Sequence, residues 1–138
     1  MTTASFRPCR SCACSALRRA TRAVTRHYEN HFRGSGLRAT QFTVLAMLAQ
    51  TGPLPISDLS NQMGIERTTL SRNLRLLEKN GWITAADDND QRFRKMALTA
   101  AGKRAASVAL SRWRRAQASV GPVLRLFGLE SSFLGQRK

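Results

Sequence analysis

The fold is decided by residues 54–99, which read LPISDLSNQMGIERTTLSRNLRLLEKNGWITAADDNDQRFRKMALT. The apolar spacing predicts a short helix over about 57–63, a break at Gly64, and a longer helix over about 66–80. Three residues at three- and four-residue steps form the buried face of this second helix, namely Leu70, Leu74 and Leu77. We therefore expect two helices joined by a tight turn.

A basic hairpin is predicted directly after the helix pair. Two β-type runs, 82–85 and 93–98, flank the Asp- and Asn-rich stretch 87–91. Three cations follow the tip within four positions, namely Arg92, Arg94 and Lys95. A helix of groove-sized diameter beside a cationic loop favours duplex DNA as the partner.

Three further helices are predicted around this region. One runs over 13–33, with an apolar stripe that includes Leu17, Val24 and Tyr28, and one runs over about 40–50. In the latter we expect Phe42, Leu45, Leu48 and Ala49 to face inward. A long helix begins after Thr99, and Pro122 is expected to stop it. We expect the N-caps of the three helices that begin near 40, 57 and 100 to be Thr40, Ser57 and Thr99.

The charge balance points to a polyanion. The 138 residues include 23 Lys+Arg against 8 Asp+Glu, a formal net charge of +15, and nineteen of the bases are arginine. Such a charge is self-repulsive without an anionic partner. Arginine also forms paired hydrogen bonds with phosphates and guanine edges more readily than lysine does. We therefore expect nucleic acid as the partner, with an anionic membrane surface as the alternative.

The second helix of the pair carries the side chains that read DNA. Arginine pairs with guanine, asparagine with adenine, and hydroxyls with phosphates or a thymine methyl. The alternative is a solvated basic helix face. The predicted DNA-contacting residues are Ser57, Arg67, Thr68, Thr69, Ser71, Arg72, Asn73, Arg75, Asp90, Arg92, Arg94 and Lys95, with Asp90 placed to orient the Arg92 guanidinium.

These motifs resemble the MarR family of winged helix-turn-helix transcription regulators. The resemblance is carried by the stretches 37–42, 59–64, 67–72, 77–83, 90–92 and 98–102, in the family's order and spacing. It implies a mainly α fold with a small β-hairpin wing, in which a winged helix-turn-helix over 37–99 is flanked by dimerisation helices over 13–36 and 100–138. Residues 1–12 are expected to form a mobile, cysteine-containing arm before this single domain.

The resemblance also implies how such a protein works. It implies a homodimer whose recognition helices enter successive major grooves of a pseudo-palindromic operator, with Arg92 in the minor groove and Asp90 as its partner. It implies repression that a small molecule or oxidation relieves. Candidate residues for a ligand pocket are His27, Tyr28, Phe32 and Trp113, each equally explained as core or interface.

Three crowded cysteines, Cys9, Cys12 and Cys14, fit a reducing cytosol better than a disulfide framework. Arg10 and the following helix N-terminus favour the reactive thiolate, so a redox switch is one hypothesis. Thiolate metal sensing is another. The series Cys9, Cys12, His27 and His31 formally matches a zinc pattern, but a straight helix between the pairs opposes it. We therefore expect no metal site and no cofactor.

Other functional classes find less support. The sequence has no Gly-rich phosphate loop and no Ser-centred nucleophile elbow, so we do not expect an enzyme. It has neither a long apolar run for a membrane span nor a signal-peptide core. A basic RNA- or membrane-binding protein without sequence specificity stays an alternative, although the chain lacks the aromatic-rich strands that stack single-stranded bases.

Overall fold

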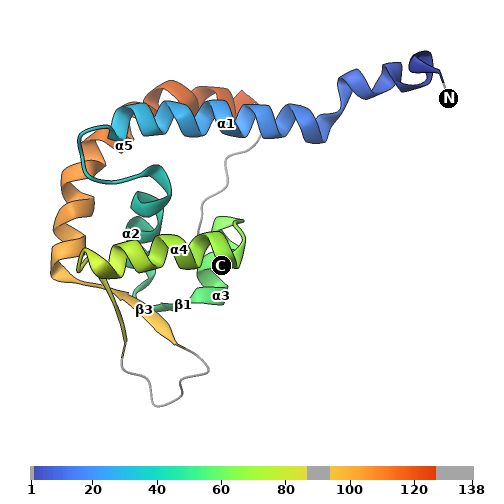
Figure 1. Ribbon diagram of the computed structural model, residues 1–138. Coiled ribbons are helices and arrows are strands. Elements are labelled where there is room, and N and C mark those ends of the chain that lie inside the picture. The colour runs from blue at the N-terminus through green and yellow to red at the C-terminus, as the bar shows by residue number, and fades with distance from the viewer. Residues whose placement is uncertain (1, 87–93, 127–138) are drawn as a thin grey trace.

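A computed structural model describes residues 2–86 and 94–126 of the chain, with side chains through Pro122 (Figure 1). It is mainly helical, as predicted. The elements in chain order are the 3-10 helix η1 (Thr3–Ser11), α1 (Ala13–Phe32), α2 (Ala39–Thr51), β1 (Leu54–Pro55), α3 (Ile56–Met63), α4 (Arg67–Lys79), β2 (Ile83–Ala85), β3 (Lys95–Leu98) and α5 (Ala100–Leu126).

The hydrophobic core lies between α2, α4 and the small sheet. The predicted leucine face of α4 is confirmed, because Leu70, Leu74 and Leu77 are all buried. α2 runs through the centre and buries most of its length, since Phe42, Leu45 and Leu48 are joined by further buried side chains on its other faces. α4 is thereby fixed with one face inward and one face toward solvent.

The sheet has three antiparallel strands in the order β1-β3-β2. The predicted hairpin is confirmed in its strands, with Ile83 opposite Leu98 and Ala85 opposite Met96. β1 was not predicted, because it consists of two residues, one of them a proline, in the connector between α2 and α3. Leu54 of β1 pairs with Met96 of β3, so this connector ties α3 to the hairpin.

Two predicted helix caps and one inward position were wrong. α2 begins at Ala39, so Thr40 lies inside it, and α3 begins at Ile56 after Pro55, which places Ser57 inside its first turn. Ala49 is exposed. The predicted Thr99 cap is confirmed, because the Gly102 N–H donates to Thr99 Oγ1 at 3.0 Å.

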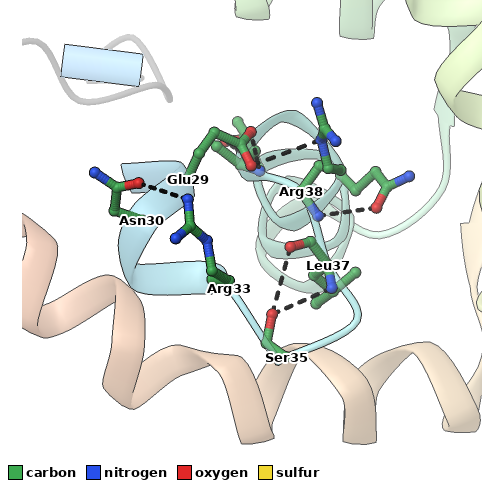
Figure 2. A network of polar contacts seen from close by, with 9 residues as sticks. Glu29, Asn30, Arg33, Ser35, Leu37 and Arg38 are labelled. Atoms are coloured by element: carbon green, nitrogen blue, oxygen red, sulfur yellow. Dashed lines mark hydrogen bonds and ion pairs between the residues drawn. The ribbon is translucent and has the colours of Figure 1, made fainter. Parts of the chain in front are cut away.

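A carboxylate from α1 contributes to the cap at the start of α2. Figure 2 shows Glu29 directed at the start of α2, where its Oε1 accepts from the Ala39 N–H at 2.9 Å. The other carboxylate oxygen lies 3.6 Å from Arg38 Nε. At the same end, the N–H of Arg38, the residue before α2, donates to Gln41 Oε1 at 3.0 Å. A carboxylate at a helix N-terminus is favourable because the peptide dipoles leave a partial positive charge there.

α5 does not stop at Pro122, contrary to the prediction, and continues to Leu126. A proline removes one helical hydrogen bond, but this loss does not end α5. Figure 1 shows that α5 changes direction along its length and that its distal part lies along α1. α1 extends beyond α5 toward the N-terminus, and Leu17 in that projecting part is 62% exposed.

The start of α5 is packed against the loop that leads into β2. Thr99 Oγ1 donates to the Gly81 carbonyl at 2.6 Å, and the Thr99 N–H donates to the Trp82 carbonyl at 3.0 Å. A Cβ on Gly102 would lie 2.0 Å from the Trp82 carbonyl oxygen. Only glycine therefore allows this close approach, which holds α5 against the wing.

Candidate nucleic-acid interface

The turn between α3 and α4 sets the angle at which α4 is presented. Gly64 ends α3 in the left-handed conformation, with φ of 65°, which glycine adopts at low cost. Ser60 Oγ then donates to the Ile65 carbonyl at 2.6 Å, and the Ile65 N–H donates back to the Ser60 carbonyl at 3.3 Å. These reciprocal bonds make a compact helix-turn-helix, which agrees with the predicted tight turn.

The solvent face of α4 collects arginines and hydroxyls along one groove. Five of the predicted residues line this shallow surface groove, namely Arg67, Thr68, Ser71, Arg72 and Arg75. The three arginines are exposed. Within the described part of the chain, none of the three guanidinium groups forms an ion pair or a side-chain hydrogen bond. Their donors are therefore available to a ligand that carries phosphates or base edges.

The other predicted residues of the helix pair lie apart from this groove. Asn73 is half-buried, and its Nδ2 donates to the Thr69 carbonyl at 3.1 Å, so one amide proton is engaged within α4. Thr69 is exposed. Ser57 is exposed in the first turn of α3. The structure thus brings five of the eight predicted residues of the helix pair together.

The base of the hairpin is joined to α4 by an ion pair. Arg94 Nη2 lies 3.6 Å from Glu78 Oε2, and both side chains retain substantial exposure. Lys95 is half-buried in β3 opposite Pro55. Asp90 and Arg92, the predicted wing-tip pair, lie outside the described residues.

The three cysteines lie at the start of the projecting helix. Cys9, Cys12 and Cys14 are free and exposed. Cys12 is the residue before α1, and its backbone N–H donates to the Cys9 carbonyl at 3.2 Å, so these two residues share one turn. Residues 3–11 are helical rather than irregular, whereas the mobility of this arm stays a prediction. Among the described residues, no group of three or more His, Cys, Asp or Glu side chains is arranged to hold a metal.

The four predicted pocket residues are not gathered in one cavity. Phe32 is 1% exposed and lies in the core, with its ring centroid 5.1 Å from that of Phe42. His27 Nε2 lies 3.1 Å from the Ala116 carbonyl, and Tyr28 donates its hydroxyl hydrogen to Gln117 Oε1. These contacts join α1 to α5.

Burial at this α1–α5 contact also affects Tyr28. The partly buried phenol loses solvation, which raises the pKa of Tyr28 above its ordinary value. The hydroxyl that bonds to Gln117 therefore stays neutral to a higher pH than that of a solvated tyrosine. His27, Tyr28 and Phe32 are accordingly committed to packing in this structure, while their role in a ligand pocket stays a prediction.

Trp113 does line a cleft, between α2 and α5. This cleft has a volume of about 180 Å³, and most of its lining is apolar. It is bordered by Phe42, Thr43, Ala46, Met47, Gln50, Leu110 and Trp113. The residues of α2 that line the cleft were not predicted as pocket residues, because their spacing along the helix is the same as that of core positions.

The fold and the arginine face together define a winged helix-turn-helix protein. The MarR family model matches residues 37–92. The crystal structure of the Mycobacterium tuberculosis transcriptional regulator MosR superposes on this chain with a TM-score of 0.73. The match covers 86% of this chain and 84% of the MosR chain, with 35% sequence identity. MosR in complex with DNA is 38% identical, covering 80% of each chain with a TM-score of 0.72.

The chain belongs to the MarR family. Members of this family are DNA-binding transcription regulators rather than enzymes. A probable transcriptional regulator from Pseudomonas aeruginosa is 25% identical, covering 81% of this chain and 85% of its own with a TM-score of 0.70.

A curated relative matches a shorter stretch. The HTH-type transcriptional regulator YwoH of Bacillus subtilis is 25% identical over 83 residues, which is 60% of this chain and 61% of the length of YwoH. None of the helices in the described part of the chain combines the length and apolar character that a membrane span needs.

Proposed function

We propose that this protein represses transcription by binding a pseudo-palindromic DNA operator as a homodimer, with α4 of each protomer in a major groove. The observation that carries the proposal is the groove of α4, where Arg67, Arg72 and Arg75 are exposed and have no protein partner among the described residues. The related MosR has been crystallised in complex with DNA, which supports DNA as the ligand of this chain.

Dimerisation is supported by the projecting part of α1. The apolar stripe by which Tyr28 and Phe32 contact the rest of the chain continues to Leu17, which is 62% exposed. An exposed leucine in line with a packed helix face is suited to contact with a second copy. The proposed dimer predicts half-sites separated by about one helical turn, roughly 10 base pairs. Binding to chromosomal DNA would place the protein in the cytoplasm.

Selection of binding sites from random duplexes tests the proposal. We expect the selected sequences to be two-fold symmetric, and we expect Arg72→Ala to relax preference at one base position of each half-site. Sedimentation with and without the selected duplex would give the stoichiometry. Selection of asymmetric sites, or equal affinity for duplex and single strand, would contradict the proposal.

The wing contact is tested separately, because the proposal assigns Arg92 to the minor groove with Asp90 as its partner. Arg92→Ala should weaken binding evenly across operator variants and flatten the dependence of log affinity on log salt by roughly one unit. An unchanged salt slope would refute the wing assignment and leave the α4 assignment intact.

A thiol switch is proposed as one mode of regulation, because all three cysteines are exposed and Cys9 and Cys12 share a turn. Peroxide would accept two electrons and two protons from two thiols, which gives a disulfide and two waters. A bond within the arm or between two arms would change how α1 meets a partner protomer. Peroxide should then alter operator affinity in wild type and leave a triple Cys→Ser protein unaffected, whereas equal responses of the two proteins would refute the switch.

A small apolar effector is the second proposed mode, and the α2–α5 cleft supports it. Phe42 and Trp113 stack with ring centroids 6.3 Å apart at its edge, which favours a flat aromatic ligand. Trp113 fluorescence during titration with small uncharged aromatic compounds would report binding. Met47→Trp, which fills the cleft, should abolish the response without affecting the thiol switch.

A further inference from the structure

Two histidines lie edge to face on adjacent turns near the end of α1, and neither the DNA face nor the cleft uses them. The imidazole rings of His27 and His31 have centroids 4.6 Å apart, and both residues are half-buried. They lie four residues apart, which places them on one face of the helix. The contact that each ring makes fixes the position of its proton.

Both rings donate to backbone carbonyls. His27 Nε2 lies 3.1 Å from the Ala116 carbonyl of α5, and His31 Nδ1 lies 2.9 Å from the His27 carbonyl. Because a carbonyl oxygen only accepts, each of these nitrogens carries the hydrogen. In the neutral rings the lone pairs therefore reside on His27 Nδ1 and His31 Nε2.

The carbonyl contact of each ring is a feature that metal-ligating histidines share. A metal-ligating imidazole usually donates its other N–H to a carbonyl or carboxylate, which fixes the tautomer and orients the ring. Two metal–nitrogen bonds of about 2.0–2.1 Å to a tetrahedral ion require nitrogens about 3.3 Å apart, and ring centroids 4.6 Å apart are close enough for such a spacing. Arg112, the cation from α5 at this end of α1, is held by the carbonyls of His31 and Arg33.

We propose that His27 and His31 bind one divalent transition-metal ion through His27 Nδ1 and His31 Nε2. Imidazole nitrogens favour zinc, nickel and copper over magnesium or calcium, and the other coordination positions are open to water. The site differs from a Cys2His2 arrangement, because it needs no contribution from the arm. Bound metal would join two turns of α1 at the point where α1 meets α5, and would stabilise that contact. The proposal is independent of DNA binding.

Zinc titration of the full-length, tag-free protein tests the site, with the cysteines replaced by serine so that no thiolate competes. By calorimetry we expect one Zn²⁺ per chain. His31→Gln and His27→Gln should each raise the dissociation constant at least about tenfold, while glutamine retains an N–H for the carbonyl contact. Zinc should also raise the melting temperature of the parent protein and not that of the double variant.

Tyr28→Phe is the matched control, because it alters the same α1–α5 contact without removing an imidazole. We expect it to leave zinc affinity unchanged. Cobalt titration adds a spectroscopic test, in which wild type and the triple Cys→Ser protein should give the same visible band. Absence of zinc binding, an unchanged dissociation constant in His31→Gln, or equal weakening in Tyr28→Phe would each overturn the proposal.

Discussion

Arginines have two different roles in the two halves of this molecule. On α4, Arg67, Arg72 and Arg75 extend into solvent and have no protein partner among the described residues. Where α1 ends, Arg112 from α5 donates to the carbonyls of His31 and Arg33 at 3.2 and 2.8 Å, and Arg38 faces Glu29. The net charge of +15 therefore combines side chains that stabilise the fold with side chains that are available to a polyanion.

Arg72→Ala should have the largest effect, which is a loss of DNA affinity. This loss would separate the arginines on α4 that are available to DNA from the arginines that stabilise the fold. A well-formed base contact by arginine contributes about 1–3 kcal/mol of discrimination, so operator binding should fall roughly ten- to hundredfold. The free energy of unfolding should change by less than about 0.5 kcal/mol, because the side chain is exposed. Fluorescence anisotropy with labelled operator and urea denaturation measure the two quantities.

Arg115→Ala is the matched control for Arg72→Ala, since it removes one exposed arginine from α5 and the same unit of charge. Its operator affinity should stay within about twofold of wild type at physiological salt, where distant charges are screened. If both variants lost affinity equally, net charge rather than the α4 face would determine binding.

Arg112→Ala should show the opposite behaviour. The guanidinium satisfies carbonyls at the end of α1, which have no helical partner of their own. Losing these bonds should reduce the free energy of unfolding by about 1–2 kcal/mol. Operator affinity, measured under conditions where the variant is folded, should change less than in Arg72→Ala. A variant that keeps full stability but loses DNA binding would place Arg112 in the DNA-contacting set.

The sequence distinguished these roles only where the interactions are local. The leucine face of α4, the Gly64 turn, the Thr99 cap and the pairing of the hairpin strands all depend on neighbouring residues, and all were predictable. Arg112 lies 81 and 79 positions along the chain from its partners His31 and Arg33. Glu29 lies 10 positions from its partner Ala39. No local sequence pattern indicates a partner at such a distance along the chain. The error at Thr40 has the same origin, because Glu29 of α1 contributes to the cap of α2. The error at Pro122 is different, since a proline need not end a long helix.

A smaller effect is expected at the joint between α1 and α2. Glu29→Ala removes both the acceptor for the Ala39 N–H and the partner of Arg38, and should cost about 1 kcal/mol, as for a lost helix cap. Glu29→Gln keeps an oxygen acceptor and should cost less. The difference between the two variants in urea denaturation, at low and high salt, isolates the charge contribution. Equal destabilisation by Ala and Gln would show that the carboxylate charge, rather than the hydrogen bond, holds α2.

The smallest effect concerns Arg94, which shares features with the DNA-facing arginines and with the arginines that stabilise the fold. It was predicted to contact DNA, yet it lies 3.6 Å from Glu78, with 59% and 36% of the two side chains exposed. An exposed pair of this kind contributes at most about 0.5 kcal/mol, so Glu78→Gln should scarcely change stability. The same substitution removes a negative charge and frees Arg94, so operator affinity should rise by about two- to threefold at low salt. The double variant Glu78→Gln/Arg94→Gln should lose that gain. If instead Glu78→Gln weakened DNA binding, the ion pair would serve to orient the hairpin, and Arg94 would belong with the arginines that stabilise the fold.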